Sequence, residues 1–171
     1  MLLRDVTPDD VDAYVRMRCD PVMMRDLGGP LPRDGMRAKV EHDVRRAAED
    51  TAWTKMIVPE GAAPSVVAGT VTLRSHDDGG QRVSEIGWMV LPAHQGQGLG
   101  KRAVRTLLGM AAEDGRWGLV HAFPAVGNAP SNGICRTLGF TLLGQRDVTF
   151  AGRLLRSNHW TIEPRPGVSG R

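Results

Sequence analysis

The sequence predicts a single α/β domain in which a mixed sheet is flanked by helices. Its 171 residues suit one domain of ordinary size, and 41% hydrophobic with 24% charged residues supply a packed core under a solvated surface. Segments with strand-like patterns are interspersed with segments whose apolar residues recur at helical spacing. Their order is one strand, two helices, three strands, a helix, a strand, a helix and two strands.

The first part of the chain is expected to form a strand and two helices joined by a loop. Residues 2–6 suit a short strand, after which Thr7 suits the N-cap of a helix that extends to about residue 19, with Pro8 in its first turn. Glycines and prolines in residues 20–35 predict a loop. A second helix follows. Its apolar side comprises Met36, Val40, Val44 and Ala47.

The remaining elements follow from the same patterns. Three strands are expected over residues 52–58, 65–74 and 83–91. A helix over residues 99–113 leads to a strand over residues 118–123 and a helix over residues 129–138, which Gly139 ends. Two last strands occupy residues 141–150 and 154–162. We therefore expect one domain over residues 1–163 and a flexible tail over residues 164–171.

Composition argues against several other classes of protein. No apolar run approaches the roughly 20 residues of a membrane span, and the N-terminus lacks the pattern of a secretory signal. Cys19 and Cys135 predict free thiols, and no Cys/His spacing predicts a metal site. The net charge of +3 comes from scattered basic residues, which does not favour a nucleic-acid partner. We expect a cytoplasmic protein.

The segment Pro92–Lys101 carries three alternating glycines between a predicted strand and a predicted helix. Glycines there allow close approach to a ligand, and free N–H groups at a helix N-terminus favour an anion such as pyrophosphate. A plain helix cap is the alternative, although it usually needs one glycine. The dinucleotide and Walker patterns both fail, because their glycine spacing and flanking residues differ.

The pattern that fits is Gln-x-x-Gly-x-Gly, formed by Gln95, Gly98 and Gly100. It resembles the acyl-CoA signature of the GNAT (Gcn5-related N-acetyltransferase) superfamily. The preceding Glu85–Leu91 resembles in particular the subgroup that acetylates ribosomal-protein N-termini. Further matches are Asn128 with Ser131, and Gly139 with Phe140.

The resemblance implies a cofactor site and a mostly antiparallel sheet. In this family the strand before the loop bulges and splays from its neighbour, and the pantetheine arm of acetyl-CoA pairs with exposed main chain, here Trp88, Met89 and Val90. Asn128 would bind the same arm or cap the following helix. The loop would cradle the pyrophosphate through Gln95 and through backbone amides. These amides belong to Gly96, Gln97, Gly98, Leu99, Gly100 and Lys101.

The resemblance also suggests catalytic residues. Glu85 is the candidate general base, with a cross-strand ion pair as the alternative, and the Val90 amide is a candidate oxyanion donor. Many relatives carry a tyrosine as proton donor where this chain has Cys135, so Ser131 and Cys135 are the candidates. Each has a structural alternative: Ser131 as a helix cap, Cys135 as a buried apolar residue. The histidines are not favoured as catalytic residues. His94 is expected to flank the glycine loop and His121 to be a satisfied core residue, whereas His159 is expected on a late strand that borders the acceptor cleft.

The function expected from these residues is transfer of an acetyl group from acetyl-CoA to a primary amine by direct attack in a ternary complex. The amine belongs to a small molecule or to a protein N-terminus. A non-catalytic acyl-CoA-binding or sensing module is the alternative. No metal, membrane or nucleic-acid partner is expected, and both a monomer and a homodimer fit the sequence.

Overall fold

The centre of the structure is a seven-stranded sheet with the order β1-β2-β3-β4-β5-β7-β6. The computed structural model describes residues 1–165. Neighbouring strands are antiparallel except β4 and β5, which are parallel, so the expected mixed, mostly antiparallel sheet is confirmed. The strands are β1 (Leu2–Asp5), β2 (Ala52–Val58), β3 (Gly69–Asp78), β4 (Gln81–Val90), β5 (Val120–Ala122), β6 (Thr141–Phe150) and β7 (Arg153–Ile162).

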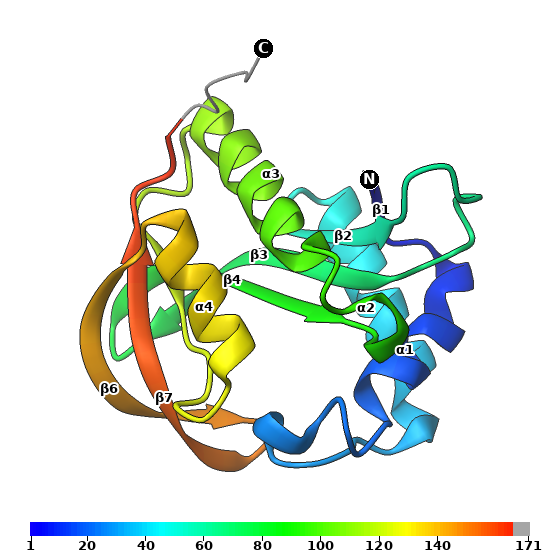
Figure 1. Cartoon of the computed structure of the whole chain (residues 1–171), viewed down its shortest axis with the longest axis horizontal. Coiled ribbons are helices and arrows are strands. Elements are labelled where there is room, and N and C mark those ends of the chain that lie inside the picture. The colour runs from blue at the N-terminus through cyan, green and yellow to red at the C-terminus, as the bar shows by residue number, and fades with distance from the viewer. Residues whose placement is uncertain (166–171) are drawn as a thin grey trace.

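Two helices cover each face of the sheet (Figure 1). Helices α1 (Val11–Arg18) and α2 (Met36–Ala48) lie on one face, and α3 (Leu99–Asp114) and α4 (Ala129–Leu138) lie on the other. All the elements predicted from the sequence are present. Strand β3 begins later than expected because the N–H of Val66 donates to the carbonyl of Ala63 and closes a turn.

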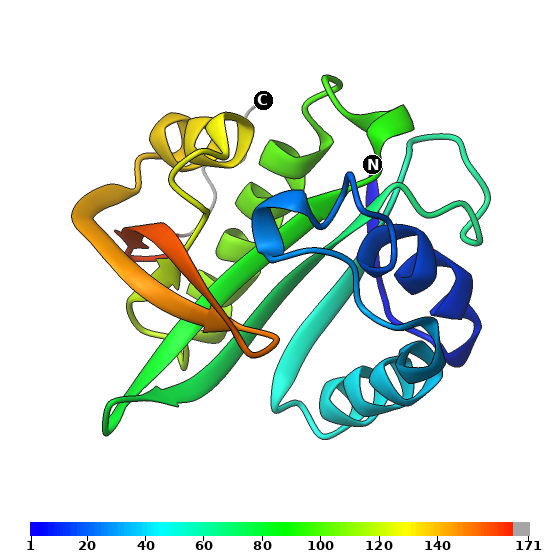
Figure 2. The ribbon, with the colours of Figure 1, turned by 90° about the horizontal axis from the view of Figure 1, so that it is seen from below.

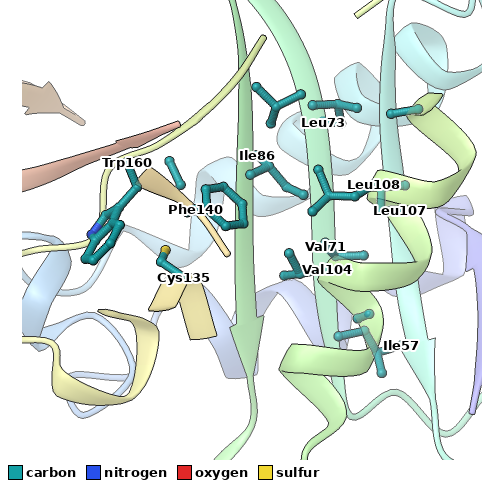
Figure 3. Close-up of a cluster of buried hydrophobic side chains, with 14 of the residues drawn as sticks. Ile57, Val71, Leu73, Ile86, Val104, Leu107, Leu108, Cys135, Phe140 and Trp160 are labelled. Carbon is teal, nitrogen blue, oxygen red and sulfur yellow. The ribbon is translucent and has the colours of Figure 1, made fainter. Parts of the chain in front are cut away.

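The larger hydrophobic core lies between the sheet and α3 and α4 (Figure 3). It is built from alternate residues of the strands and from one side of each helix. Its labelled members are Ile57, Val71, Leu73, Ile86, Val104, Leu107, Leu108, Cys135, Phe140 and Trp160. Strand residues between these members point to the opposite face, where the polar side chains of the site gather.

A polar contact joins the two helices of the other face. The hydroxyl of Tyr14 on α1 donates to Asp43 on α2 at 2.7 Å, and Lys39 pairs with the same carboxylate. Burial and the charge of Asp43 raise the pKa of Tyr14. The contact holds α1 against α2.

The domain boundary expected at residue 163 stays a prediction. Residues 164 and 165 follow the last strand without regular structure, and the rest of the expected tail lies outside the described residues.

Candidate active site

Strands β4 and β5 separate in the middle of the sheet. They pair only where Ser84 meets Val120 and Glu85 meets His121. Strand β5 ends one residue later, whereas β4 continues beside β3 to Val90. The expected splay is present, and one edge of β4 faces a gap beyond Glu85.

The register with β3 decides which main-chain groups face this gap. The N–H of Leu91 donates to the carbonyl of Ala68 at 2.8 Å, and successive residues of an antiparallel strand alternate between the two edges. The main chain of Trp88 and Val90 therefore faces the gap, whereas that of Met89 faces β3. Of the three residues expected to offer main chain to a pantetheine arm, the register leaves Trp88 and Val90.

The bulge expected in β4 is not observed. Over the full described length of the pair, β3 and β4 keep one register from Gly69↔Val90 to Asp78↔Gln81. The main chains instead crowd each other at Gly69, where a Cβ would collide with the carbonyl oxygen of Met89 and lie 3.0 Å from the Cα of Val90. Glycine at this position permits the close approach.

The loop between β4 and α3 presents a row of free amides. Gly96 and Gly98 have φ of 75° and 71°, a region that favours glycine, and Gly98 is the N-cap of α3. Such a row at a helix N-terminus suits a phosphate or pyrophosphate. Within the described part of the chain, no acceptor is present for the main-chain N–H groups of Gly96, Gln97, Gly98, Leu99, Gly100 and Lys101.

Gln95 and Gly100 hold this loop against β4. The side-chain amide of Gln95 donates to the carbonyl of Val90 at 2.8 Å, so this side chain positions the loop. A Cβ on Gly100 would lie 3.3 Å from Val90 and 3.2 Å from Ile134, so glycine lets α3 approach both. Beside them, the buried indole N–H of Trp88 has no partner among residues 1–165.

Glu85 lies on the face of the sheet opposite α3. Its carboxylate is 3.3 Å from the guanidinium of Arg74 and 3.6 Å from Nδ1 of His76. Arg74 is its direct partner on β3, so the cross-strand ion pair, one of the two expectations, is present. A carboxylate where the strands separate is also placed to accept a proton, and that role stays a prediction.

Splayed strands followed by a glycine loop are also the features of a known protein family. A model of the acetyltransferase (GNAT) domain matches residues 1–141. The chain belongs to the GNAT acetyltransferase family. No curated protein matches its sequence.

Solved GNAT structures share the fold at low sequence identity. One is an acetyltransferase from Salmonella typhimurium that modifies the N-terminal serine of a 50S ribosomal-subunit protein (TM-score 0.76, 19% identity, 94% of this chain and 93% of that chain). Another is a ribosomal-protein-alanine N-acetyltransferase from Brucella melitensis (TM-score 0.74, 22% identity, 95% and 99%). A third is the putative acetyltransferase yncA from Salmonella typhimurium with acetyl-CoA (TM-score 0.70, 22% identity, 100% and 98%).

The matching family model makes this chain a GNAT acetyltransferase. No helix in the described residues is long and apolar enough to cross a membrane. Within residues 1–165, no group of three or more His, Cys, Asp or Glu side chains is arranged to hold a metal ion.

The first turn of α4 brings two of the expected GNAT residues together. Asn128 is its N-cap, and its side-chain oxygen accepts from the N–H of Ser131 at 3.0 Å. The capping role considered for Asn128 is therefore present, and its side-chain NH₂ has no acceptor among the described residues. Ser131 is half-buried, and its hydroxyl also has no partner there.

Cys135 lies one turn further, inside the core of this GNAT domain. Figure 3 shows it beside Phe140 and Trp160, and its side chain is fully buried. Burial raises the pKa of the Cys135 thiol to about 12. A thiol of that pKa is a weaker acid than an ordinary thiol, near 8.5. The buried apolar role considered for Cys135 is therefore present, and the roles of Ser131 and Cys135 as proton donors stay predictions.

Asn132 was missed in the sequence. It is buried, donates to the carbonyls of Ala125 and Asn128, and accepts from Asn158 and Trp160. All four hydrogen-bonding positions of its amide are thus used. They fix α4 to β7 and to the loop that precedes α4. The sequence did contain a signal for its burial: Asn132 lies about one helical turn before Cys135, on the same side of the predicted helix.

The core position expected of His121 is wrong, because its half-buried ring lies on the polar face, where its Nδ1 is 2.8 Å from Nε2 of His159. His159 lies on the late strand β7, and its place beside the acceptor stays a prediction. His94 belongs to the short turn before the glycine loop, as expected.

The loop over residues 20–35 meets the β6–β7 hairpin on the same face (Figure 2). A Cβ on Gly28 would lie 2.7 Å from Cδ of Arg153, and one on Gly29 would lie 2.7 Å from its guanidinium. The side chain of Arg153 therefore lies against both glycines and links the two segments beside the site.

Proposed function

We propose that this GNAT protein transfers the acetyl group of acetyl-CoA to a primary amine by direct attack in a ternary complex. The observation that carries the proposal is the open edge of β4, which the short turn Pro92–His94 joins to six free amides at the N-terminus of α3. The edge suits an extended chain of amides, and the helix N-terminus suits the pyrophosphate that follows it.

Positions on β4 near the glycine loop are proposed to bind the cofactor, and the position far from it is proposed to take part in catalysis. Val90 adjoins the loop and Glu85 lies five residues away, about 17 Å along a strand. The N–H of Val90 and both main-chain groups of Trp88 are therefore proposed to hold the pantetheine arm, together with the free amide NH₂ of Asn128. This order favours the N–H of Trp88 over that of Val90 as the donor to the thioester oxygen.

The proposed catalytic residues are Glu85, where β4 and β5 separate, and Ser131, in the first turn of α4. When bound, acetyl-CoA supplies the acetyl group as a thioester. Glu85 receives a proton from the acceptor ammonium, directly or through water, and Ser131 protonates the departing sulfur. The acceptor is a small-molecule amine or a protein N-terminus. The titles of the two ribosomal-protein acetyltransferases with this fold support the second class.

Mass spectrometry tests the proposal. Protein incubated with acetyl-CoA and a panel of peptides, aminosugars, polyamines and amino acids is expected to give an acetylated product. Binding of acetyl-CoA without product from any acceptor would instead support the non-catalytic sensing module.

Glu85→Gln is expected to lower kcat by about 100-fold or more, because the amide cannot take up a proton. Affinity for acetyl-CoA, measured by calorimetry, should change by less than about threefold, since main-chain groups carry binding. Glu41→Gln, an exposed carboxylate on α2, is the matched control and should match the parent. Unchanged kcat in Glu85→Gln would remove Glu85 from the mechanism.

A further inference from the structure

Two histidines 38 residues apart form a hydrogen-bonded pair next to Glu85. Nδ1 of His121 on β5 and Nε2 of His159 on β7 are 2.8 Å apart. The rings are stacked at 25°, and Phe123 lies 4.7 Å from the ring of His159. One ring must donate and the other accept in this hydrogen bond. The pair can therefore bind one further proton, but a second would break the bond.

The pair and Glu85 occupy the same face of the sheet. His121 lies between the buried core residues Val120 and Ala122, and His159 precedes the buried Trp160, so both rings point away from the core. Glu85 precedes the buried Ile86 and points the same way. The Glu85↔His121 pair is also the last one before β4 and β5 separate, so His121 is the neighbour of the proposed base on β5. Their side chains make no hydrogen bond or ion pair in the described residues, where the carboxylate contacts Arg74 and His76.

The groups around the pair keep it neutral. Burial is the largest cause that lowers the pKa of His121, and the nearby charges of Arg146 and His76 lower it further, against Asp78 and Glu85. Burial, His121 and Arg146 lower the pKa of His159, against Asp78. Arg146 is held in place by Asp78, at 2.7 Å and 2.9 Å. At neutral pH the pair is therefore neutral and can take up one proton.

We infer that His121 and His159 form a proton-accepting pair that takes the acceptor's proton from Glu85 through water and passes it to solvent. The inference rests on the proposed amine acetylation. In one turnover the acceptor ammonium loses two protons, a C–N bond forms and the C–S bond breaks. One proton goes to the departing sulfur and the other to the pair. The pair then returns to its neutral form by releasing that proton to water.

The pH profile of kcat/KM tests the inference. The parent should gain activity as pH rises through the pKa of the pair, below the usual 6.5, and then level off. His121→Gln and His159→Gln should each lower kcat at least about tenfold. They should also displace the rising part of the pH profile, called here the acid limb. Arg146→Gln should keep the pair but raise its pKa, because a positive charge is removed and Asp78 is left unpaired. Its acid limb should therefore move to higher pH.

The exposed His42 on α2 offers the matched control, and His42→Gln should reproduce the parent profile. An NMR titration of the imidazoles in the protein without acetyl-CoA gives a second readout. The His121 and His159 signals should titrate below 6.5 and be coupled, so that His159→Gln shifts the titration of His121. Independent titration of the two rings would overturn the inference. So would an acid limb that is unchanged in His121→Gln and His159→Gln variants that fold like the parent. Absence of product from the parent enzyme would instead count against the proposed function, and the NMR result would still decide whether the pair exists.

Discussion

Replacing Asn132 by leucine is expected to destabilise the protein by about 3–5 kcal/mol, because buried polar partners are left without hydrogen bonds. Asn158 and Trp160 donate to the side-chain oxygen of Asn132 at 2.8 Å and 2.9 Å, and both are buried. Leucine is similar in size, so little of the loss comes from a cavity. Chemical denaturation of the variant measures the change in the free energy of unfolding.

Thr137→Ala on the same helix is the control for Asn132→Leu. The Thr137 hydroxyl is exposed and bonds only to Gly133 of its own helix, so its removal should change stability by less than about 0.5 kcal/mol. A loss below about 1 kcal/mol for Asn132→Leu would show that water or rearrangement satisfies Asn158 and Trp160.

The elements of the fold were predictable because each depends on local sequence. Apolar spacing identifies α3, and Pro and Gly mark the turns between strands. The free amides of the loop were predictable for the same reason, since Gly96 and Gly98 make the loop conformation a local property. Local pattern likewise indicated that Asn128 could cap α4.

The side-chain partners in the site depend on register and strand order, which local pattern does not contain. Whether the main chain of Met89 faces β3 or the gap follows from pairing between two strands. His121 and His159 meet only because β7 lies between β5 and β6 in the sheet. Glu85 meets Arg74 only in the observed β3–β4 register. The burial of Cys135 reflects how α4 packs on the sheet, and its helix alone does not reveal it.

Gly69→Ala tests the close approach of β3 and β4 where the proposed cofactor edge begins. The added Cβ would collide with the Met89 carbonyl and lie 3.0 Å from the Cα of Val90, and neither is the end of a flexible side chain. The strands must move apart, which should weaken the hydrogen bond from Leu91 to Ala68 and shift Val90. We expect a stability loss of about 2–4 kcal/mol. Affinity for acetyl-CoA should fall about tenfold or more, because Val90 anchors both the edge and the loop through Gln95.

Gly133→Ala separates this effect from the general cost of replacing a glycine. Gly133 lies inside α4, and a Cβ there would meet nothing within 4 Å. Alanine at this position should stabilise the helix by about 0.5–1 kcal/mol. Calorimetry with acetyl-CoA and thermal unfolding of both variants provide the comparison. If Gly69→Ala weakened folding but left affinity for acetyl-CoA unchanged, the position of Val90 would not control binding, and the β4 edge would lose its proposed role. A loss of both stability and affinity in Gly69→Ala, with affinity unchanged in Gly133→Ala, ties cofactor binding to the spacing of these two strands.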